Sequence, residues 1–196
     1  MNGLNMSRRA LIMGAALLGF AAGAARAESQ VTAPKLDPAN TVLLTLKGDH
    51  VVTIKLLPEL APKHVARVKQ LIADHFYDNT PFHRVIEGFM AQGGDPTGTG
   101  EGGSKYPNVP AEFSQSAHFV RGTVGAARSS DPDSANSQFF IMFAPNPNLD
   151  GQYTIWGQVV SGMEYVDQIK RGDPGENGKV SDPDRVVKMR LASSPN

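Results

Sequence analysis

The residue of this sequence whose setting most favours chemistry is an arginine in a largely apolar run. Arg84 stands within residues 82–86, which can form a strand, and residues 89–92 make a second such run. Gly88 between them accepts the positive φ that a tight turn requires, so the two runs predict a β-hairpin. A guanidinium stays charged in proteins, so Arg84 would act by hydrogen bonding and charge rather than by passing on a proton.

The neighbours of Arg84 on this hairpin decide between two interpretations. Alternate residues of a strand share a face, which places Phe82, Arg84 and Ile86 on one side, and pairs Met90 with Gln92 on the returning strand. The simplest interpretation is an edge arginine whose stem covers apolar surface while its charge reaches water. The thioether and the amide within the same hairpin favour instead a site that grips a ligand.

The hairpin resembles the signature of the cyclophilin-type peptidyl-prolyl isomerases. That signature runs Phe-His-Arg, Val or Ile, Ile, two turn residues, and then Phe-Met-x-Gln-Gly-Gly-Asp, and residues 82–95 contain every named position. A second block, Ser-Gln-Phe-Phe-Ile at residues 137–141, matches the family at the expected distance downstream. The resemblance extends from about Thr41 to Leu191. It implies a mostly β fold, an eight-stranded antiparallel closed barrel capped by two α-helices, with the site on the outer face of the barrel.

The activity that this resemblance implies is rotation about the peptide bond before proline. Resonance between the amide nitrogen and the carbonyl opposes that rotation with a barrier of ~18–20 kcal/mol. In the twisted state the nitrogen lone pair is localised, so a donor aimed at it binds the transition state better than the planar amide. The resemblance gives Arg84 this role. One charge-assisted hydrogen bond is worth about 1.5–3 kcal/mol, or one to two decades in rate, so a dry pocket must supply the rest.

The resemblance also implies which residues hold the substrate peptide. Four of them form a pocket for the proline ring, Gln92 holds the carbonyl side, and Ser129 offers a backbone carbonyl. The implied substrate-binding residues are Phe89, Met90, Gln92, Ser129, Gln138, Phe140, Leu149 and Tyr153. Strand alternation by itself would assign Phe89 to the core, and it makes one of Phe139 and Phe140 a core residue whichever face is inside.

Four residues near these blocks need separate interpretation. Asn148 and Tyr153 stand where the best-known eukaryotic members carry tryptophan and histidine, so the resemblance does not extend to cyclosporin binding. Trp156 lies in a predicted strand, and we expect it in the core. His83 faces away from Arg84 by alternation, and we expect a buried histidine whose ring is hydrogen-bonded to backbone rather than a catalytic one.

The first 27 residues, 1–27, have the features of a secretory signal peptide. Arg8 and Arg9 precede a small-residue apolar run at 10–24, and Ala25-Arg26-Ala27 has the small-x-small form of a cleavage site. The apolar run is too short and too rich in glycine for a stable membrane span, which needs ~20 strongly apolar residues. Paired arginines are typical of twin-arginine signals and also occur in ordinary Sec signals, so the export route stays open.

Composition limits the partners and the chemistry of the chain. Of its 19 basic residues three belong to the signal, which leaves 16 against 19 acidic residues, so no basic excess favours nucleic acid. The absence of cysteine excludes disulfides and thiolate chemistry, and the five histidines lack metal-ligand spacing, so we expect no cofactor and no metal. Signal and resemblance together imply a soluble, periplasmic or otherwise exported monomer that acts on proline-containing, unfolded or partly folded exported polypeptides.

The rest of the chain must supply the scaffold of the hairpin. Residues 28–40 are polar and without period, which predicts a flexible leader before a single domain at 41–196. Apolar spacing predicts a helix from Ala61 to Ile72, and the capping box Ser161-x-x-Glu164 predicts a second helix that Gly172 closes. Pattern alone indicates a β sandwich or barrel. The further strands are predicted at residues 41–46, 51–56, 119–127, 138–143, 154–160 and 187–191.

Two other motifs and one rival function compete with this interpretation. Residues 98–103 satisfy the dinucleotide pattern Gly-x-Gly-x-x-Gly, but two prolines within 104–110 exclude the helix it needs, so we expect a mobile or tightly folded rim. Asp131-x-Asp133 hints at calcium, but Ala135 replaces the next ligand and a turn is expected. The rival function is a proline-peptide binding or holdase chaperone module with little turnover, which would not require the charge of Arg84.

Overall fold

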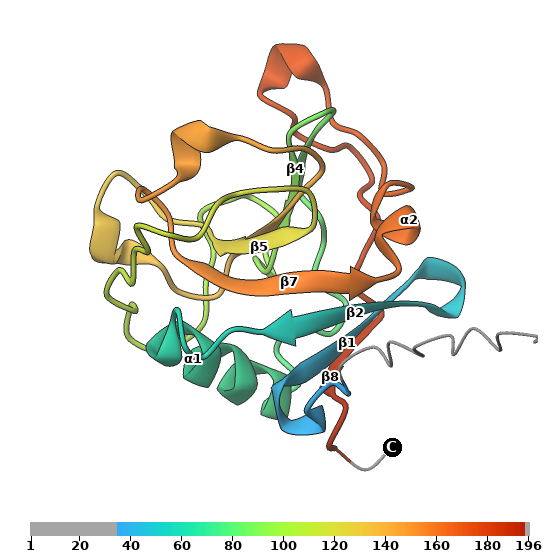
Figure 1. Ribbon diagram of the computed structural model, residues 1–196. Helices are drawn as coiled ribbons and strands as arrows, with labels where there is room; N and C mark the ends of the chain where they lie inside the picture. The colour runs from blue at the N-terminus through green and yellow to red at the C-terminus, as the bar shows by residue number, and fades with distance from the viewer. Residues whose placement is uncertain (1–34, 195–196) are drawn as a thin grey trace, which may run out of the picture. The chain divides into compact units, whose positions relative to one another are not determined.

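A computed structural model describes residues 35–194, which form one antiparallel sheet of eight strands with two helices (Figure 1). The predicted signal at 1–27 and the first part of the predicted leader lie outside the described residues. The strands are β1 Thr41–Leu46, β2 His50–Leu56, β3 Arg84–Ile86, β4 Met90–Gly93, β5 Thr123–Ala126, β6 Phe139–Met142, β7 Ile155–Ser161 and β8 Lys188–Leu191. The eight antiparallel strands that the sequence predicts are therefore confirmed.

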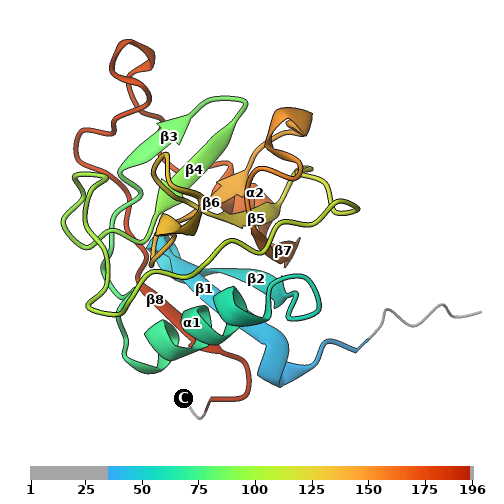
Figure 2. The same cartoon turned by 90° about the vertical axis from the view of Figure 1, so that its left-hand side faces the viewer.

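The sheet does not close into a continuous barrel of strands among the described residues. The strand order is β3-β4-β6-β5-β7-β2-β1-β8, so β3 and β8 are the two edges and no ladder joins them among the described residues. The irregular segment 178–187 fills this seam, as Figure 2 shows beside β3. Its backbone hydrogen bonds join Val85 N–H to the Gly178 carbonyl at 2.8 Å and Phe82 N–H to the Asp184 carbonyl at 2.9 Å. The expected closed barrel is thus a curled sheet that irregular chain completes, because β3 is only three residues long.

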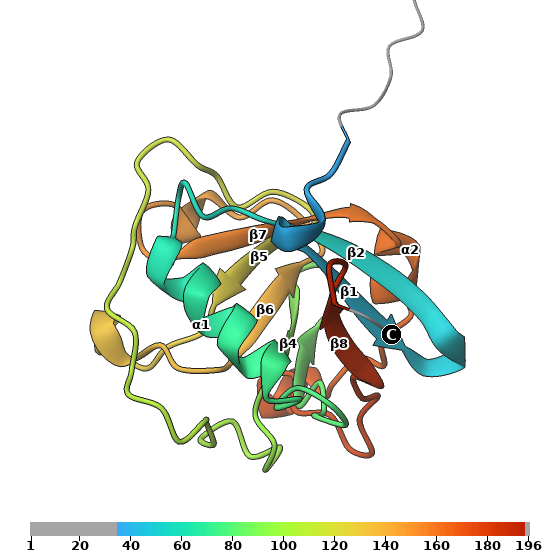
Figure 3. The ribbon, with the colours of Figure 1, turned by 90° about the horizontal axis from the view of Figure 1, so that it is seen from below.

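Alternation along the strands fills the interior of the curled sheet. Leu44, Ile54 and Ile141 are fully buried there, and α1, Pro62–Ala73, lies near one end (Figure 3). The helix buries the positions that the three-and-four spacing predicts, with Pro62 in the first turn, where its missing N–H leaves no hydrogen bond unmade. The helical prediction, Ala61 to Ile72, is confirmed to within one residue at each end.

The second helix is much shorter than its capping box predicts. α2 spans only Met163–Val166, and its N-cap is Gly162 at φ 83°, with no side-chain capping bond. The predicted cap at Ser161 is therefore wrong. A Cβ at Gly162 would lie 2.5 Å from the Val51 carbonyl oxygen, so the close approach of β2 sets a left-handed glycine at this position. The predicted end at Gly172 is wrong too, because Gly172 packs against Gly178 in the seam.

The end of the predicted leader is ordered in the structure. Asp37 caps a short 3-10 helix, η1 Pro38–Asn40, by accepting a hydrogen bond from the Ala39 N–H. Lys69 of α1 donates to the Asn40 side chain at 2.7 Å, which ties this turn to the domain. Within residues 35–194, no helix combines the length and the apolar character needed to cross a membrane.

Candidate active site

Strand register assembles the outer face on which the site lies. Strands β3, β4 and β6 lie side by side in the sheet (Figure 2). Arg84 of β3 stands opposite Gln92 of β4, and Gln92 stands opposite Phe140 of β6, so the three form one row across these strands. Val85 and Ala91 form the next pair along β3 and β4, and both are fully buried in the interior cluster. Because successive side chains point to opposite faces, a three-strand register suffices to place a cation, an amide and an aromatic ring together.

Two phenylalanines show where alternation stops applying. Phe82 is fully buried in the interior cluster and does not share a face with Arg84, because β3 begins only at Arg84. The predicted common face of Phe82 and Arg84 is therefore wrong. Phe89 lies in the turn that precedes β4, so the rule that would assign it to the core does not hold there, and its side chain lines the outer pocket.

The outer face carries an apolar pocket of about 170 Å³. It is lined by Arg84, Phe89, Met90, Gln92, Ala127, Arg128, Phe140, Leu149 and Tyr153. Phe140 forms one wall, stacked on Phe119 at a centroid distance of 5.6 Å and in edge contact with Tyr153 at 5.8 Å. Seven of the nine sequence-predicted site residues meet here, and a cation borders the apolar wall.

The other two predicted residues, Ser129 and Gln138, line an adjoining polar cavity of about 540 Å³. The Ser129 carbonyl already accepts a hydrogen bond from the Arg128 Nη1 at 2.9 Å. Gln138 lies behind Gln92, whose Nε2 donates to the Gln138 Oε1 at 2.9 Å, so Gln138 supports the pocket instead of lining it. The cavity and the pocket share Gln92, Ala127 and Arg128.

Arg84 is held by neutral hydrogen-bond acceptors. Its Nη1 donates to the Gln92 Oε1 at 3.1 Å, and its Nε and Nη2 donate to the backbone and side-chain oxygens of Asn177 at 3.1 and 3.0 Å. None of the ion pairs among residues 35–194 includes Arg84. Burial lowers the pKa of the Arg84 guanidinium, and Tyr153 opposes this shift, but the group remains a full cation at neutral pH.

Sequence reasoning missed three residues of this site, Ala127 in the pocket lining, Arg128 and Asn177. The Arg128 guanidinium lies over the Tyr153 ring at 4.4 Å and donates to the Gln152 carbonyl at 2.8 Å, so it holds one wall of the pocket. Asn177 belongs to a loop 93 residues away from Arg84 along the chain. The dipeptide Asn177-Gly178 is typical of a turn, but no local pattern reveals which side chain a turn contacts.

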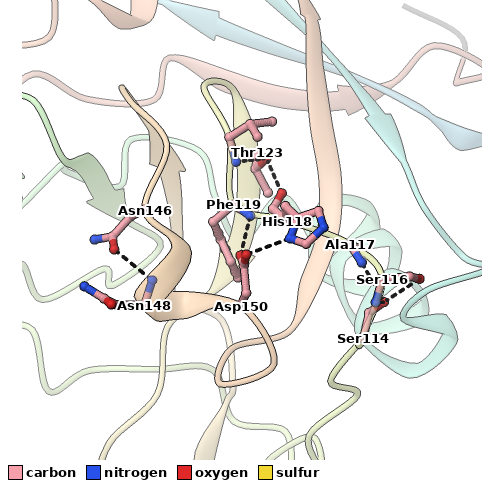
Figure 4. Close-up of polar contacts among 10 residues, drawn as sticks. Ser114, Ser116, Ala117, His118, Phe119, Thr123, Asn146, Asn148 and Asp150 are labelled. Atoms are coloured by element: carbon pink, nitrogen blue, oxygen red, sulfur yellow. Dashed lines mark hydrogen bonds and ion pairs between the residues drawn. The ribbon is translucent and has the colours of Figure 1, made fainter.

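A network of hydrogen bonds fixes the loop that carries Leu149 (Figure 4). The Asp150 carboxylate accepts the Phe119 N–H at 2.8 Å and the His118 Nδ1–H at 2.7 Å. The hydrogen bond from the Phe119 N–H lowers the pKa of Asp150 most, and the hydrogen bond from His118 lowers it further. The Asn146 side chain accepts the Asn148 N–H at 3.2 Å in the same loop. The loop of Leu149, which lines the pocket, is thereby joined to Phe119, which stacks on the Phe140 wall from outside the pocket lining.

The glycine-rich rim is tightly folded around one buried carboxylate. Asp95 is fully buried and accepts the N–H groups of Thr97, Gly100 and Gly102 at 2.7–3.1 Å. A Cβ at Gly102 would lie 2.0 Å from the Asp95 Oδ1, so this position requires glycine. The Gly100 and Gly102 carbonyls accept both N–H groups of Gln138, which connects the rim to the residues beside Arg84. No helix follows the glycines, in agreement with the rejection of a dinucleotide motif.

Acid should loosen the glycine-rich rim. Burial raises the pKa of Asp95, but the hydrogen bonds from Thr97, Gly100 and Gly102 outweigh it and leave the pKa lowered. The unfolded chain therefore takes up the proton first, and the stability that Asp95 contributes is present above about pH 4 and is lost as pH falls further. We expect Asp95→Asn to cost about 1–3 kcal/mol in the free energy of unfolding at pH 7 and to reduce the acid slope.

Urea unfolding between pH 3 and pH 7 measures how the free energy of unfolding depends on pH in the wild type and in Asp95→Asn. Asp182→Asn, at a fully exposed side chain, is the matched control and should match the wild-type slope. Other carboxyls with lowered pKa keep part of the slope in every variant. An Asp95→Asn variant with an unchanged slope would show that the rim carboxylate is not linked to acid stability.

Two residues beside the site bear on the predicted core. Trp156 is buried in the interior, 6.1 Å from the Phe139 ring, as predicted. His83 is buried too: neither ring nitrogen has a partner with full hydrogen-bond geometry among the described residues, but the Pro81 backbone acts on the ring as a hydrogen-bond partner that raises its pKa. Burial lowers the pKa of His83 because the charged ring would lose its hydration, and the neighbouring Asp95 opposes the shift only in part.

Comparison with known proteins agrees with this geometry. Residues 41–191 match the family model described as cyclophilin type peptidyl-prolyl cis-trans isomerase. A Brucella suis protein named probable peptidyl-prolyl cis-trans isomerase is 51% identical over 194 residues, which cover 93% of this chain and 95% of that protein. Peptidyl-prolyl cis-trans isomerase B of Bacillus subtilis is 38% identical over 128 residues, covering 65% of this chain and 89% of its own length.

Solved structures with the same fold include two cyclophilins. One, from Hirschia baltica, superposes with a TM-score of 0.72 at 27% identity and covers 82% of this chain and 77% of its own. Another is a cyclophilin-type isomerase of Cryptosporidium parvum, determined in the presence of the dipeptide Ala-Pro. It has a TM-score of 0.70 at 29% identity, and the match covers 79% of this chain and 99% of the Cryptosporidium chain. With the family model spanning most of the domain, this chain belongs to the cyclophilin-type peptidyl-prolyl cis-trans isomerase family.

Proposed function

We propose that this isomerase acts on X-Pro bonds of exported polypeptides and that Arg84 is its catalytic residue. The observation that carries the proposal is a charged guanidinium at the border of a pocket of about 170 Å³ with apolar walls, a volume that leaves room for a proline ring. Phe89, Met90, Phe140 and Leu149 supply apolar walls against which a pyrrolidine ring packs. Such a pocket holds the ring while the amide that precedes it turns.

Rotation would proceed without any proton transfer to the protein. As the amide twists, its nitrogen lone pair is no longer shared with the carbonyl, and the nitrogen becomes a hydrogen-bond acceptor. Of the five N–H groups of a guanidinium, three of those on Arg84 are engaged by Gln92 and Asn177, which leaves one on each terminal nitrogen. A donor that gains a partner only in the twisted state lowers the barrier without tightening the ground state.

The surroundings of the pocket supply the remaining catalytic effect. The planar amide is more dipolar than the twisted one, so removing water from it destabilises the ground state relative to the twisted state. The adjoining polar cavity, lined by Ser129 and Gln138, has room for the residues next to the proline. The Ser129 carbonyl keeps one lone pair beside its bond to Arg128, and the peptide N–H of a substrate would be its partner.

Export is proposed from the first 27 residues alone. Arg8 and Arg9, the apolar run at 10–24 and the small-x-small site ending at Ala27 together form the three parts of a secretory signal. The mildly acidic remainder has no attraction for nucleic acid, and its substrates would be unfolded or partly folded exported chains. In this proposal the protein is a periplasmic monomer that assists folding.

Cell fractionation with N-terminal sequencing tests the export proposal. The protein recovered from the periplasm should begin at Glu28, and replacing both Arg8 and Arg9 with lysine should block export only if the twin-arginine route is used. Purified mature protein should then speed the proline-limited refolding phase of an exported substrate, a phase that takes tens to hundreds of seconds unassisted. Recovery of the whole chain from the cytoplasm, starting at Met1, would refute export without affecting the isomerase assignment.

A further inference from the structure

The guanidinium of Arg84 is gripped along one whole edge by a single residue. Its Nε and Nη2, which form that edge, donate to the backbone oxygen and the Oδ1 of Asn177 at 3.1 and 3.0 Å. This is the two-pronged geometry with which arginine usually binds a carboxylate. Here the partner is neutral, and so is Gln92 on the third bond. The orientation of Arg84 is therefore fixed while its positive charge stays uncompensated.

The loop that presents Asn177 is docked on β3 at both of its ends. The Gly172 N–H donates to the Val85 carbonyl at 2.9 Å, and the Val85 N–H donates to the Gly178 carbonyl at 2.8 Å. Within the loop, Asp173 accepts the Gly175 N–H at 2.7 Å. A Cβ at Gly178 would lie 2.4 Å from the Ile86 side chain, so the loop contacts the strand without a gap. Asn177 thus rests on the same strand that carries Arg84.

The backbone at Asn177 is what turns its two oxygens toward one guanidinium. Its φ of 55° and ψ of 35° lie in the left-handed region, which few residues other than glycine and asparagine adopt readily. Glycine would keep this backbone and the bond to Nε but would lose the side-chain acceptor. Aspartate would keep both acceptors but would add a charge that neutralises Arg84.

We propose that Asn177 is a positioning residue for the isomerase reaction, which orients the Arg84 guanidinium toward the proline nitrogen without neutralising it. The inference rests on the proposed catalytic role of Arg84. The neutrality of the grip matters because Arg84 must stabilise a developing lone pair by charge as well as by hydrogen bonding. A carboxylate at this position would hold the side chain more tightly and would leave less positive charge for the substrate.

A double-mutant cycle separates positioning from general structural damage. We expect Asn177→Gly to lower kcat about three- to tenfold, the effect of one hydrogen bond, with little change in KM. In an Arg84→Ala background the same substitution should have no further effect, because the group it positions is gone. Asp49→Gly, at another exposed left-handed residue, with φ 60°, adds the same backbone freedom in the turn between β1 and β2 and should keep wild-type kcat.

The charge arm of the experiment uses Asn177→Asp. This variant should be slower than Asn177→Gly even though it retains both acceptor oxygens, and its thermal midpoint should not fall. Equal losses from Asn177→Gly in both backgrounds, or wild-type kcat in Asn177→Gly or Asn177→Asp, would overturn the proposal. A wild-type rate in Arg84→Ala alone would instead refute the catalytic role of Arg84, so the two failures are distinguishable.

Discussion

Replacing Arg84 with alanine should lower kcat/KM for an X-Pro peptide about 10- to 100-fold while changing the peptide Kd by less than threefold. One charge-assisted hydrogen bond of about 1.5–3 kcal/mol is lost in the twisted state only, because the planar amide nitrogen offers Arg84 no lone pair. The apolar walls that hold the ring, Phe140 and Leu149 among them, remain in place. Exchange spectroscopy by NMR measures the rate, and titration of the same peptide measures Kd.

Arg84→Lys is the matched control for charge. It keeps a cation but cannot grip Gln92 and Asn177 at once, so its rate should lie between those of the wild type and the alanine variant. A protein that only docks proline peptides would bind them and show no acceleration in any of the three forms. Equal rates in wild type and Arg84→Ala would show that the pocket alone carries the catalysis.

Replacing Phe139 with alanine should have the largest effect on stability, about 3–5 kcal/mol in the free energy of unfolding. The Phe139 ring is fully buried inside the curled sheet and meets Tyr77, Phe82 and Trp156 edge-on at 5.6, 6.2 and 6.1 Å. Its removal leaves a cavity that these rings cannot fill. Urea unfolding at 25 °C gives the loss, and the folded fraction should retain nearly wild-type kcat/KM.

The neighbouring Phe140→Ala variant is the matched comparison. Phe140 lies on the opposite face, in the pocket wall, so its removal should reduce kcat/KM of fully folded protein at least tenfold, mainly through KM. The two substitutions delete the same atoms one residue apart. If Phe139→Ala reduced activity of the folded protein more than Phe140→Ala, the assignment of the two faces would be wrong.

Much of this architecture was accessible from the sequence because strand patterns are local. Residues 41–46 match β1 at both ends, and residues 138–143 contain β6 whole. The predicted strand at 119–127 is longer than β5, since Phe119 and Val120 belong to the irregular segment that Asp150 and Thr123 hold. Periodicity finds an alternating run but does not say which of its residues have a partner strand.

Failures of prediction have one physical cause, contacts made between distant segments. Gly162 replaces Ser161 as the cap of α2 because β2 approaches it, and β2 is about a hundred residues earlier in the chain. Asn177 reaches Arg84 only because the seam brings its loop against β3. A sequence motif reveals the residues of one hairpin, whereas residues such as Asn177 that contact it from distant segments become visible only in the folded structure.

The seam between β3 and β8 has a thermodynamic consequence for the site. Irregular chain completes the sheet there, and its hydrogen bonds to Phe82 and Val85 are the ones that a local opening of this join would break. Asn177 directly precedes this irregular segment, so such an opening would release the Arg84 guanidinium. The twisted amide meets a held guanidinium only while this join is closed, so opening would reduce the fraction of molecules that are competent for catalysis.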